Sequence, residues 1–241
     1  MPTRTFYDNL GLNEDIQLDL SMLEATGLVM HDESKNHSMA TMHAAIGTPL
    51  WQQIATGHFG LQLNAAYPTL NTNQFVDIPA ANCTNLDFTS TDYSLAIWLR
   101  WSDSEYTSQV VMGKYVVGTR GWEVYLTEVG ALRYMTVRHH HAGGAPIRTA
   151  SYSLGWEYDT WYLFGYSKIG TTGYHYRDGE PIITVSDILI DPESSIADDF
   201  RIGCRYTEDA NWFKARFHRP RAWSRGLSAA EHKQLFEAGY P

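Results

Sequence analysis

Two glutamates, Glu123 and Glu128, are the first residues of this chain whose type and spacing could support catalysis. A retaining glycosidase needs two carboxyl groups about 5 Å apart, one acting as nucleophile and the other as general acid. Successive side chains of a strand point to opposite faces, so two residues five positions apart lie on opposite faces of a regular strand. We therefore expect no enzymatic activity from this pair and interpret both as solvated carboxylates of a strand and its turn.

Metal binding is the second chemistry to consider, because His139, His140 and His141 are consecutive. Imidazole is a common zinc ligand, but a regular strand cannot direct three consecutive rings at one ion. A loop could do so, and a polar run at the end of a strand is the favoured interpretation. The two cysteines, Cys83 and Cys204, match no metal cluster or nucleophile motif, and a bridge between them stays an open alternative. We predict no metal and no cofactor.

Sugar recognition is the chemistry that outward-facing residues of a sheet could support here. Aromatic rings can stack on a sugar, while arginine or histidine can bond its hydroxyl groups. If Trp122 faces the core, Tyr125 faces outward, and the same alternation places Arg133, His175 and Arg177 outward of their aromatic or apolar neighbours. These four residues are our candidate carbohydrate-binding patch. The alternative is an ordinary wet sheet face or a protein contact.

The clearest structural signal lies between residues 156 and 183, where aromatic and apolar strands lead into a hairpin. Asp178-Gly179 supplies its turn, because a two-residue type I′ loop needs a positive φ at both positions. The stretch 93–101 mixes β-branched, aromatic and aliphatic residues as a central strand does. Residues 16–22 alternate between apolar and polar, which predicts a strand with one face on the core and the other in water.

Short strands separated by turn residues continue along the chain. We predict them at residues 40–46, 60–63, 75–78, 108–115, 121–127, 131–139, 200–205 and 211–223. Ser228 and Glu231 form a capping box for one helix that runs to about Ala238, with Gly239 as its left-handed stop. These elements predict a single all-β domain closed by a short C-terminal helix.

Composition excludes several partners. The 27 acidic side chains outnumber the 18 basic ones, for a formal charge of −9, so we expect repulsion from nucleic acid and from anionic membranes. No apolar segment approaches the roughly 20 residues of a membrane span. The N-terminal residues lack the apolar run of a signal peptide, so we expect the protein to be made in a cytoplasm.

Four stretches, in order along the chain, resemble one known family. They are DESKNH at 32–37, YSLAIWLRW at 93–101, DTWYLF and YRDGEPI at 159–164 and 176–182, and WFKARFHRPRAWSRGLSAAEHKQLF at 212–236. They are similar to the laminin-G-like jelly roll of the concanavalin A-like lectin/glucanase superfamily. The resemblance covers about residues 16–239 and implies a two-sheet antiparallel jelly-roll sandwich over 15–241, with 1–14 as an N-terminal arm.

Two departures from the family pattern bear on function. The retaining glucanases of this superfamily carry Glu-x-Asp-x-x-Glu on one strand, and no such spacing occurs here. Members often have an acidic pair in the closing strand, where this chain has His218 and Arg219. Calcium requires oxygen ligands, so we expect no calcium site there.

The resemblance also implies a setting, because jelly rolls of this family are similar to decoration or fibre components of phage particles. Our first hypothesis is a non-enzymatic virion protein, made in the host cytoplasm, whose lectin-like jelly roll is able to bind glycans. Its partners would be other virion subunits and further copies of itself, held by an assembly arm with Phe6, Tyr7, Leu10 and Leu12. A free or cell-surface carbohydrate-binding module is the alternative, and a glycan-cleaving enzyme is the third hypothesis.

Overall fold

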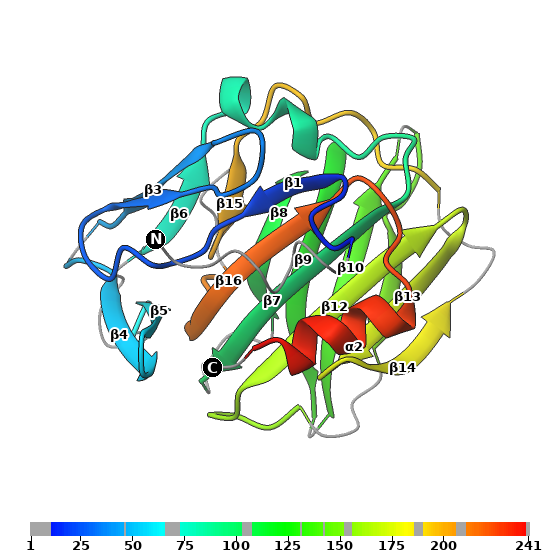
Figure 1. The fold of residues 1–241 in the computed structure, drawn as a ribbon. Coiled ribbons are helices and arrows are strands. Elements are labelled where there is room, and N and C mark those ends of the chain that lie inside the picture. The colour runs from blue at the N-terminus through cyan, green and yellow to red at the C-terminus, as the bar shows by residue number, and fades with distance from the viewer. Residues whose placement is uncertain are drawn as a thin grey trace.

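The structure, a computed structural model, describes residues 11–45, 47–65, 73–102, 108–130, 132–141, 143–151, 156–185, 190–205 and 211–239. Two antiparallel sheets are stacked face to face, and one α-helix covers part of the outer face of the first sheet (Figure 1). The predicted all-β jelly-roll sandwich with a C-terminal helix is therefore confirmed.

The first sheet, which we call sheet A, is the one that carries the helix. Its strands run in the order β14 (Glu180–Val185), β13 (Thr172–Arg177), β12 (Tyr162–Ile169), β7 (Tyr93–Trp101), β16 (Ala215–Trp223), β5 (His58–Leu63) and β4 (Leu50–Ala55). A further strand, β1 (Ile16–Asp19), pairs with β16. The central position of β7 agrees with its apolar composition, since a strand buried on both faces is apolar along its whole length.

The second sheet, sheet B, lies across the core from sheet A. Its order is β11 (Ile147–Ser151), β10 (Leu132–His140), β9 (Arg120–Val129), β8 (Ser108–Val116), β15 (Phe200–Ile202), β6 (Phe75–Ile78), β3 (Met39–His43) and β2 (Val29–His31). Two short 3-10 turns, Ala80–Asn82 and Thr84–Leu86, connect β6 to β7. The long strands β8, β9 and β10 correspond to the strands predicted at 108–115, 121–127 and 131–139.

The core lies between the two sheets and is rich in aromatic rings. Tyr93 of sheet A reaches across to sheet B, where its hydroxyl group lies 2.6 Å from Nε2 of His139. Phe88 stacks on Tyr93, and Trp122 packs on both rings. Fully burying side chains of this size contributes about 1.5 to 3 kcal/mol each, so the sandwich needs no disulfide. Cys83 and Cys204 are both buried and are not bridged to each other.

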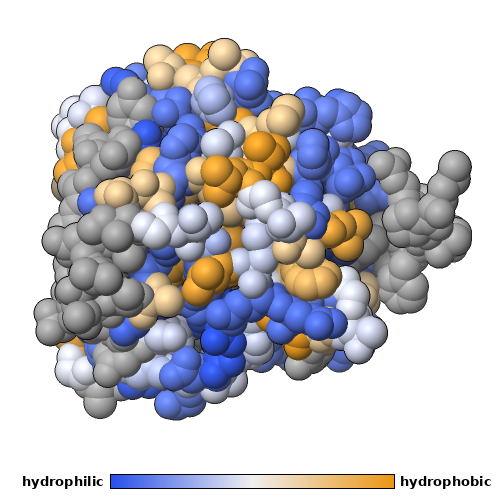
Figure 2. Space-filling model, turned by 90° about the vertical axis from the view of Figure 1, so that its left-hand side faces the viewer, coloured by the Kyte–Doolittle hydropathy of each residue, from blue (hydrophilic) through white to orange (hydrophobic). Residues whose placement is uncertain are grey.

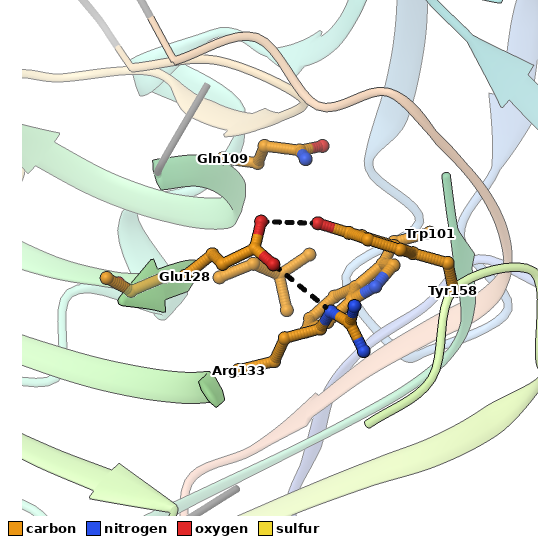
Figure 3. A pocket seen from close by; sticks show the side chains of 7 residues that line it. Trp101, Gln109, Glu128, Arg133 and Tyr158 are labelled. Carbon is orange, nitrogen blue, oxygen red and sulfur yellow. Dashed lines mark hydrogen bonds and ion pairs between the residues drawn. The ribbon is translucent and has the colours of Figure 1, made fainter. Parts of the chain in front are cut away.

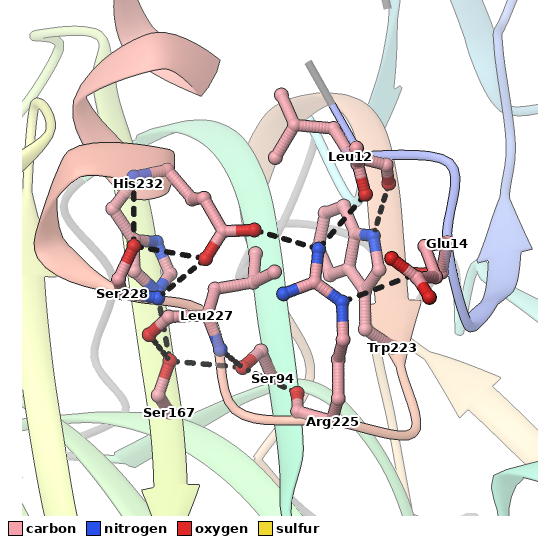
Figure 4. A network of polar contacts seen from close by, with 11 residues as sticks. Leu12, Glu14, Ser94, Ser167, Trp223, Arg225, Leu227, Ser228 and His232 are labelled. Carbon is pink, nitrogen blue, oxygen red and sulfur yellow. Dashed lines mark hydrogen bonds and ion pairs between the residues drawn. The ribbon is translucent and has the colours of Figure 1, made fainter. Parts of the chain in front are cut away.

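The helix α2 (Ala229–Glu237) begins at the predicted capping box. On its inner side, the imidazole of His232 stacks on Tyr176 with ring centroids 3.9 Å apart. Its Nε2 lies 2.9 Å from Oγ of Ser167 (Figure 4). The helix therefore buries residues on the outer face of sheet A. Its C-terminal Gly239 has no positive φ, so the predicted left-handed stop is wrong.

The segment before β1 packs on the chain's own sandwich. Leu12 is buried in a cluster with Trp98, Leu163 and Leu235, and its carbonyl oxygen accepts a 2.7 Å hydrogen bond from the indole N–H of Trp223 (Figure 4). Leu12 is thus not available to a neighbouring chain, contrary to its assignment to an assembly arm. The other arm residues, Phe6, Tyr7 and Leu10, lie outside the described residues.

Differences between the predicted and observed strands are local. The short strands β4 and β11 were not predicted, and β16 begins at Ala215 rather than at residue 211. The polar face of β1 is not wet: Gln17 and Asp19 are both buried, because side chains of the 32–38 turn and Asn85 cover this strand. Alternation identified the strand but could not show that a loop covers its polar face.

The surface around β3 and β4 shows apolar side chains scattered among polar ones (Figure 2). Leu28, Met39 and Leu50 are exposed in this region. Isolated exposed apolar residues are usual on folded proteins. Among the described residues, no helix is long and apolar enough to cross a membrane.

Candidate functional site

The candidate site is the end of the sandwich at which β7 ends and β9 turns into β10, the lower end in Figure 1. In β9, the inward-facing row that ends with Leu126 continues with Glu128. In β10, the inward row of Met135 and Val137 begins with Arg133. Because these strands are antiparallel, Glu128 and Arg133 are directly opposite each other. We call this end the mouth.

The guanidinium of Arg133 contacts several neighbours, of which Figure 3 shows Tyr158 and Glu128. It lies 3.9 Å from the centroid of the Tyr158 ring, and its Nη1 donates to the Trp156 carbonyl oxygen at 3.1 Å. The Tyr158 hydroxyl donates to Oε2 of Glu128 at 2.5 Å, while the other carboxylate oxygen of Glu128 lies 3.6 Å from Nε of Arg133. Burial opposes the charge of Arg133, but the contacts with Tyr158, Glu128 and Glu157 outweigh it and raise the pKa of this guanidinium.

A small hollow lies at the centre of the mouth and has room for about one water-sized group. Its lining residues are Trp101, Gln109, Leu126, Thr127, Glu128, Arg133 and Tyr158. Trp101 is only 4% exposed, and its indole N–H makes no hydrogen bond within the described part of the chain. A buried donor without an acceptor costs about 1 to 3 kcal/mol, so this group favours a partner from outside the chain.

Arg177, the last residue of β13, lies near two further aromatic rings of the mouth, those of Trp156 and Tyr162. Its guanidinium lies 5.6 Å from the Trp156 ring centroid and 5.7 Å from that of Tyr162. The Trp156 ring in turn contacts the ring of Trp101, with centroids 6.2 Å apart. The mouth therefore combines two arginines, four aromatic rings and two glutamates, a composition suited to a flat polar ligand.

The structure brings two of the four predicted binding residues together and separates the other two. Arg133 and Arg177 meet at the mouth, but they belong to the inward-facing rows, so their predicted outward direction is wrong. His175 is fully buried against Phe164 and Tyr166, so its outward direction is wrong too. The error has a physical cause: β13 has aromatic residues on both faces, because α2 covers Tyr176 from outside.

Tyr125 faces outward as predicted, yet it is 7% exposed and lies in a different cluster. The guanidinium of Arg138 lies 4.7 Å from its ring centroid, and Arg138 also forms an ion pair with Glu123. Arg205 donates from Nε to the same carboxylate at 3.0 Å. Glu123 is fully buried, so its interpretation as a solvated carboxylate is wrong.

The histidine run does not converge on one point. His139 faces the core and bonds to Tyr93, whereas His140 contacts the ring of Tyr115 on the opposite face. Among the described residues, no group of three or more His, Cys, Asp or Glu side chains is placed to hold a metal ion.

In the closing strand β16, Arg219 binds the Asp19 carboxylate through two hydrogen bonds of 3.0 and 2.9 Å.

Trp101, Tyr158 and the pairing of Glu128 with Arg133 were not predicted from the sequence as parts of a site. The predicted strands 121–127 and 131–139 leave Glu128 outside both strands, whereas the observed register pairs it with Arg133. The positions of Trp101 and Tyr158 could not be read from spacing, because these residues come from a strand of the other sheet and from a loop.

The comparisons with known proteins fit this architecture. The family model described as "Concanavalin A-like lectin/glucanases superfamily" matches residues 70–231, more than half of the chain. This chain belongs to the concanavalin A-like lectin/glucanases superfamily. The match spans β6 to α2 and so includes every residue of the mouth. No curated protein sequence matches the chain.

Several solved structures share the fold. The binding domain of botulinum neurotoxin DC, solved with rat synaptotagmin II, has a TM-score of 0.68 at 13% identity, over 94% of this chain and 52% of that one. The binding domain of Paraclostridial Mosquitocidal Protein 1 has a TM-score of 0.69 at 14% identity, over 94% and 52%. A structure of botulinum neurotoxin type C, whose cell entry depends on two ganglioside molecules, has a TM-score of 0.67 at 12% identity, over 95% and 52%.

This chain spans about half the length of these three structures. At such low identity the likeness shows the fold alone. Two of the three are named as binding domains, and none is named as an enzyme.

Proposed function

We propose that this chain is a non-enzymatic glycan-binding module whose site is the mouth of the sandwich. The observation that carries the proposal is the fixed Arg133 guanidinium, stacked on Tyr158 and paired with Glu128 beside a small hollow. A binding group that is already held in its bound geometry loses little entropy when a ligand arrives. The superfamily and the named binding domains with this fold support the same class of function.

Binding would use the two kinds of surface that a sugar presents. The C–H face of a pyranose ring packs on aromatic side chains, here the partly exposed Tyr158 and Tyr162. The guanidinium groups of Arg133 and Arg177 donate hydrogen bonds to hydroxyl oxygens, and Glu128 accepts from hydroxyl groups. The mouth therefore provides donors and acceptors around an aromatic platform.

The carboxylates of the mouth support binding rather than hydrolysis. A glycosidase needs two carboxyl groups that flank the scissile bond. Glu128 is the one carboxylate among the residues that line the hollow, and Tyr158 and Arg133 already engage it. Glu157, the other carboxylate of the mouth, pairs with the same guanidinium. Glu123, the second glutamate weighed in the sequence, is buried between two arginines on the outer face of sheet B.

Screening of the chain against immobilised oligosaccharides, followed by calorimetric titration of the hits, tests this function. We expect saturable binding of at least one glycan, with the ligand recovered intact by mass spectrometry. Absence of binding to every glycan, or shortening of the recovered ligand, would contradict the proposal.

A virion role stays a prediction from the sequence, as do homo-oligomerisation and contact with other virion subunits. Phe6, Tyr7 and Leu10 lie outside the described residues, and the burial of Leu12 in its own domain removes one of the four residues behind the arm hypothesis. A free or cell-surface module would use the same mouth. Light scattering of the purified chain separates a monomer from a homo-oligomer.

A further inference from the structure

We infer, on the basis of the proposed function, that the hollow of the mouth binds one hydroxyl group of an uncharged sugar and discriminates against sugars that carry a carboxylate. The polar atoms that surround the hollow, and the sum of their charges, favour this class of ligand.

Two N–H donors at the hollow have no acceptor within the described part of the chain. The Trp101 indole N–H is buried and makes no hydrogen bond within the described part of the chain. Nε of Arg133 is also buried without a hydrogen bond there, since its contact with Glu128 is an ion pair at 3.6 Å. Figure 3 shows the Trp101 ring behind the Arg133 side chain, and both residues line the hollow. A ligand atom in the hollow would therefore meet two N–H donors.

The hollow also has a hydrogen-bond acceptor, the carboxylate of Glu128. Glu128 also lines the hollow, and a carboxylate oxygen can accept more than one hydrogen bond. A hydroxyl group accepts from N–H donors and donates to a carboxylate, so it satisfies both kinds of group at once. An ammonium group would face the two N–H donors, and a carboxylate would face Glu128. A hydroxyl group is also small enough for the space.

The charges around the hollow favour a neutral ligand. Among the residues that line the hollow, Arg133 and Glu128 carry opposite charges and cancel. Glu157 adds a further negative charge, with its Oε2 3.3 Å from Nη1 of Arg133. The whole chain has a formal charge of −9. An acidic sugar would therefore approach a guanidinium that two carboxylates already neutralise, within a negative field.

The experiment compares two sets of soluble oligosaccharides by calorimetry with the intact chain. The first set contains neutral glucose, mannose, galactose and xylose oligomers, and the second contains galacturonate and sialylated oligomers. We expect the neutral set to bind at least ten times more tightly. Tighter binding of the acidic set would overturn the inference while leaving glycan binding intact, and no binding by either set would overturn the proposed function as well.

Two substitutions test the atoms directly. Trp101→Phe removes the N–H and keeps an aromatic ring, and we expect the affinity for the neutral ligand to fall about tenfold. Trp51→Phe is the matched control, because the Trp51 indole N–H donates to the Gly27 carbonyl oxygen away from the mouth. Unchanged affinity in Trp101→Phe would contradict the inference.

Glu128→Gln keeps the shape of the side chain and removes its charge. It provides a second test of the inference if Trp101→Phe does not fold. We expect it to weaken binding of the neutral ligand and to reduce the preference over acidic sugars at least threefold. Glu180→Gln is its control, because Glu180 is exposed and pairs with Lys233 at the start of β14. A preference that stays the same in Glu128→Gln would overturn the charge argument.

Discussion

The guanidinium of Arg133 lies 3.9 Å from the ring centroid of Tyr158, and the Tyr158 hydroxyl group binds the glutamate that faces Arg133 across the strand pair. This relationship links a strand of sheet B to a loop that follows β11. It fixes the loop and the arginine with respect to each other, because each of the three side chains contacts the other two. The mouth is therefore organised before any ligand binds, which is what a binding module requires.

Replacement of Glu123 by glutamine tests the buried ion cluster on the outer face of sheet B. Glu123 is fully buried and pairs with both Arg138 and Arg205. Removing its charge takes a buried counter-ion away from both guanidinium groups, so we expect a loss of about 3 to 5 kcal/mol in the free energy of unfolding. Urea denaturation measures it. The exposed pair of Lys233 with Glu180 provides the control, and Glu180→Gln should leave the midpoint unchanged. A Glu123→Gln protein as stable as the parent would show that solvent reaches this cluster.

Stability should fall as the solution becomes mildly acidic. Burial lowers the pKa of His175 and of His232 to about 3, and burial lowers the pKa of His139 and of His218 to about 4. In the unfolded chain a histidine titrates near pH 6.5, so the unfolded state binds more protons below that pH. The stabilisation is complete above about pH 6.5 and is lost as the pH falls toward the folded values. Each histidine should contribute about 1.4 kcal/mol per pH unit within this window.

Urea denaturation at pH 6.5, 5.7 and 5.0 measures this slope, within a range where few carboxylates titrate. His175→Phe should make the slope smaller, because the ring lies against Phe164 and Tyr166 and a phenyl group does not take up a proton. His31→Phe, at an exposed position, is the control. A slope that is the same in His175→Phe and in the parent would refute the assignment.

Gly165 of β12 should tolerate no side chain. A Cβ atom there would lie 2.5 Å from Nδ1 of His232 and 3.1 Å from Cβ of Tyr176. We expect Gly165→Ala to destabilise the protein by about 1 to 3 kcal/mol and to increase proteolysis of the C-terminal helix, since His232 attaches α2 to the sheet. Gly239→Ala is a matched control, because no atom lies within 4 Å of its Cβ position. Equal cleavage of the two variants would contradict this role of Gly165.

Chelation should leave the melting temperature unchanged. The Asp19 carboxylate is bound by the guanidinium of Arg219 through two hydrogen bonds, so a cationic group from the chain already neutralises it. A metal that binds only the folded state raises stability by RT ln(1 + [L]/Kd), and its removal would lower the melting temperature by several degrees. Thermal melts with and without EDTA decide the matter, and a drop of that size would show a metal site.

The sequence predicted strands best where local chemistry determines them. β7 begins and ends where its apolar and aromatic run predicted, at Tyr93 and Trp101. Asp178 and Gly179 have φ values of 53° and 78°, as a type I′ turn requires. Ser228 and Glu231 form the expected reciprocal cap. In each case the deciding interaction lies within a few residues along the chain.

The site was predicted only in part, because its geometry depends on contacts between distant segments. Alternation gives the period of β13 but not which of its faces meets the core. Tyr176 packs on His232 of α2, so His175 and Arg177 face inward instead of outward. The same limit applies to Glu123, whose partner Arg205 is 82 positions away. Arg133 and Arg177 were chosen for their type, and the structure places them together through Trp156.

The most direct test of the central claim is calorimetric titration of the best neutral oligosaccharide into the parent chain and into Arg133→Ala, with Lys233→Ala as the control. We predict at least a tenfold loss of affinity in Arg133→Ala, an unchanged affinity in Lys233→Ala, and a folded state at the temperature of the titration for all three proteins. An Arg133→Ala protein that is folded and binds the sugar as tightly as the parent would contradict the assignment of the mouth as the glycan-binding site.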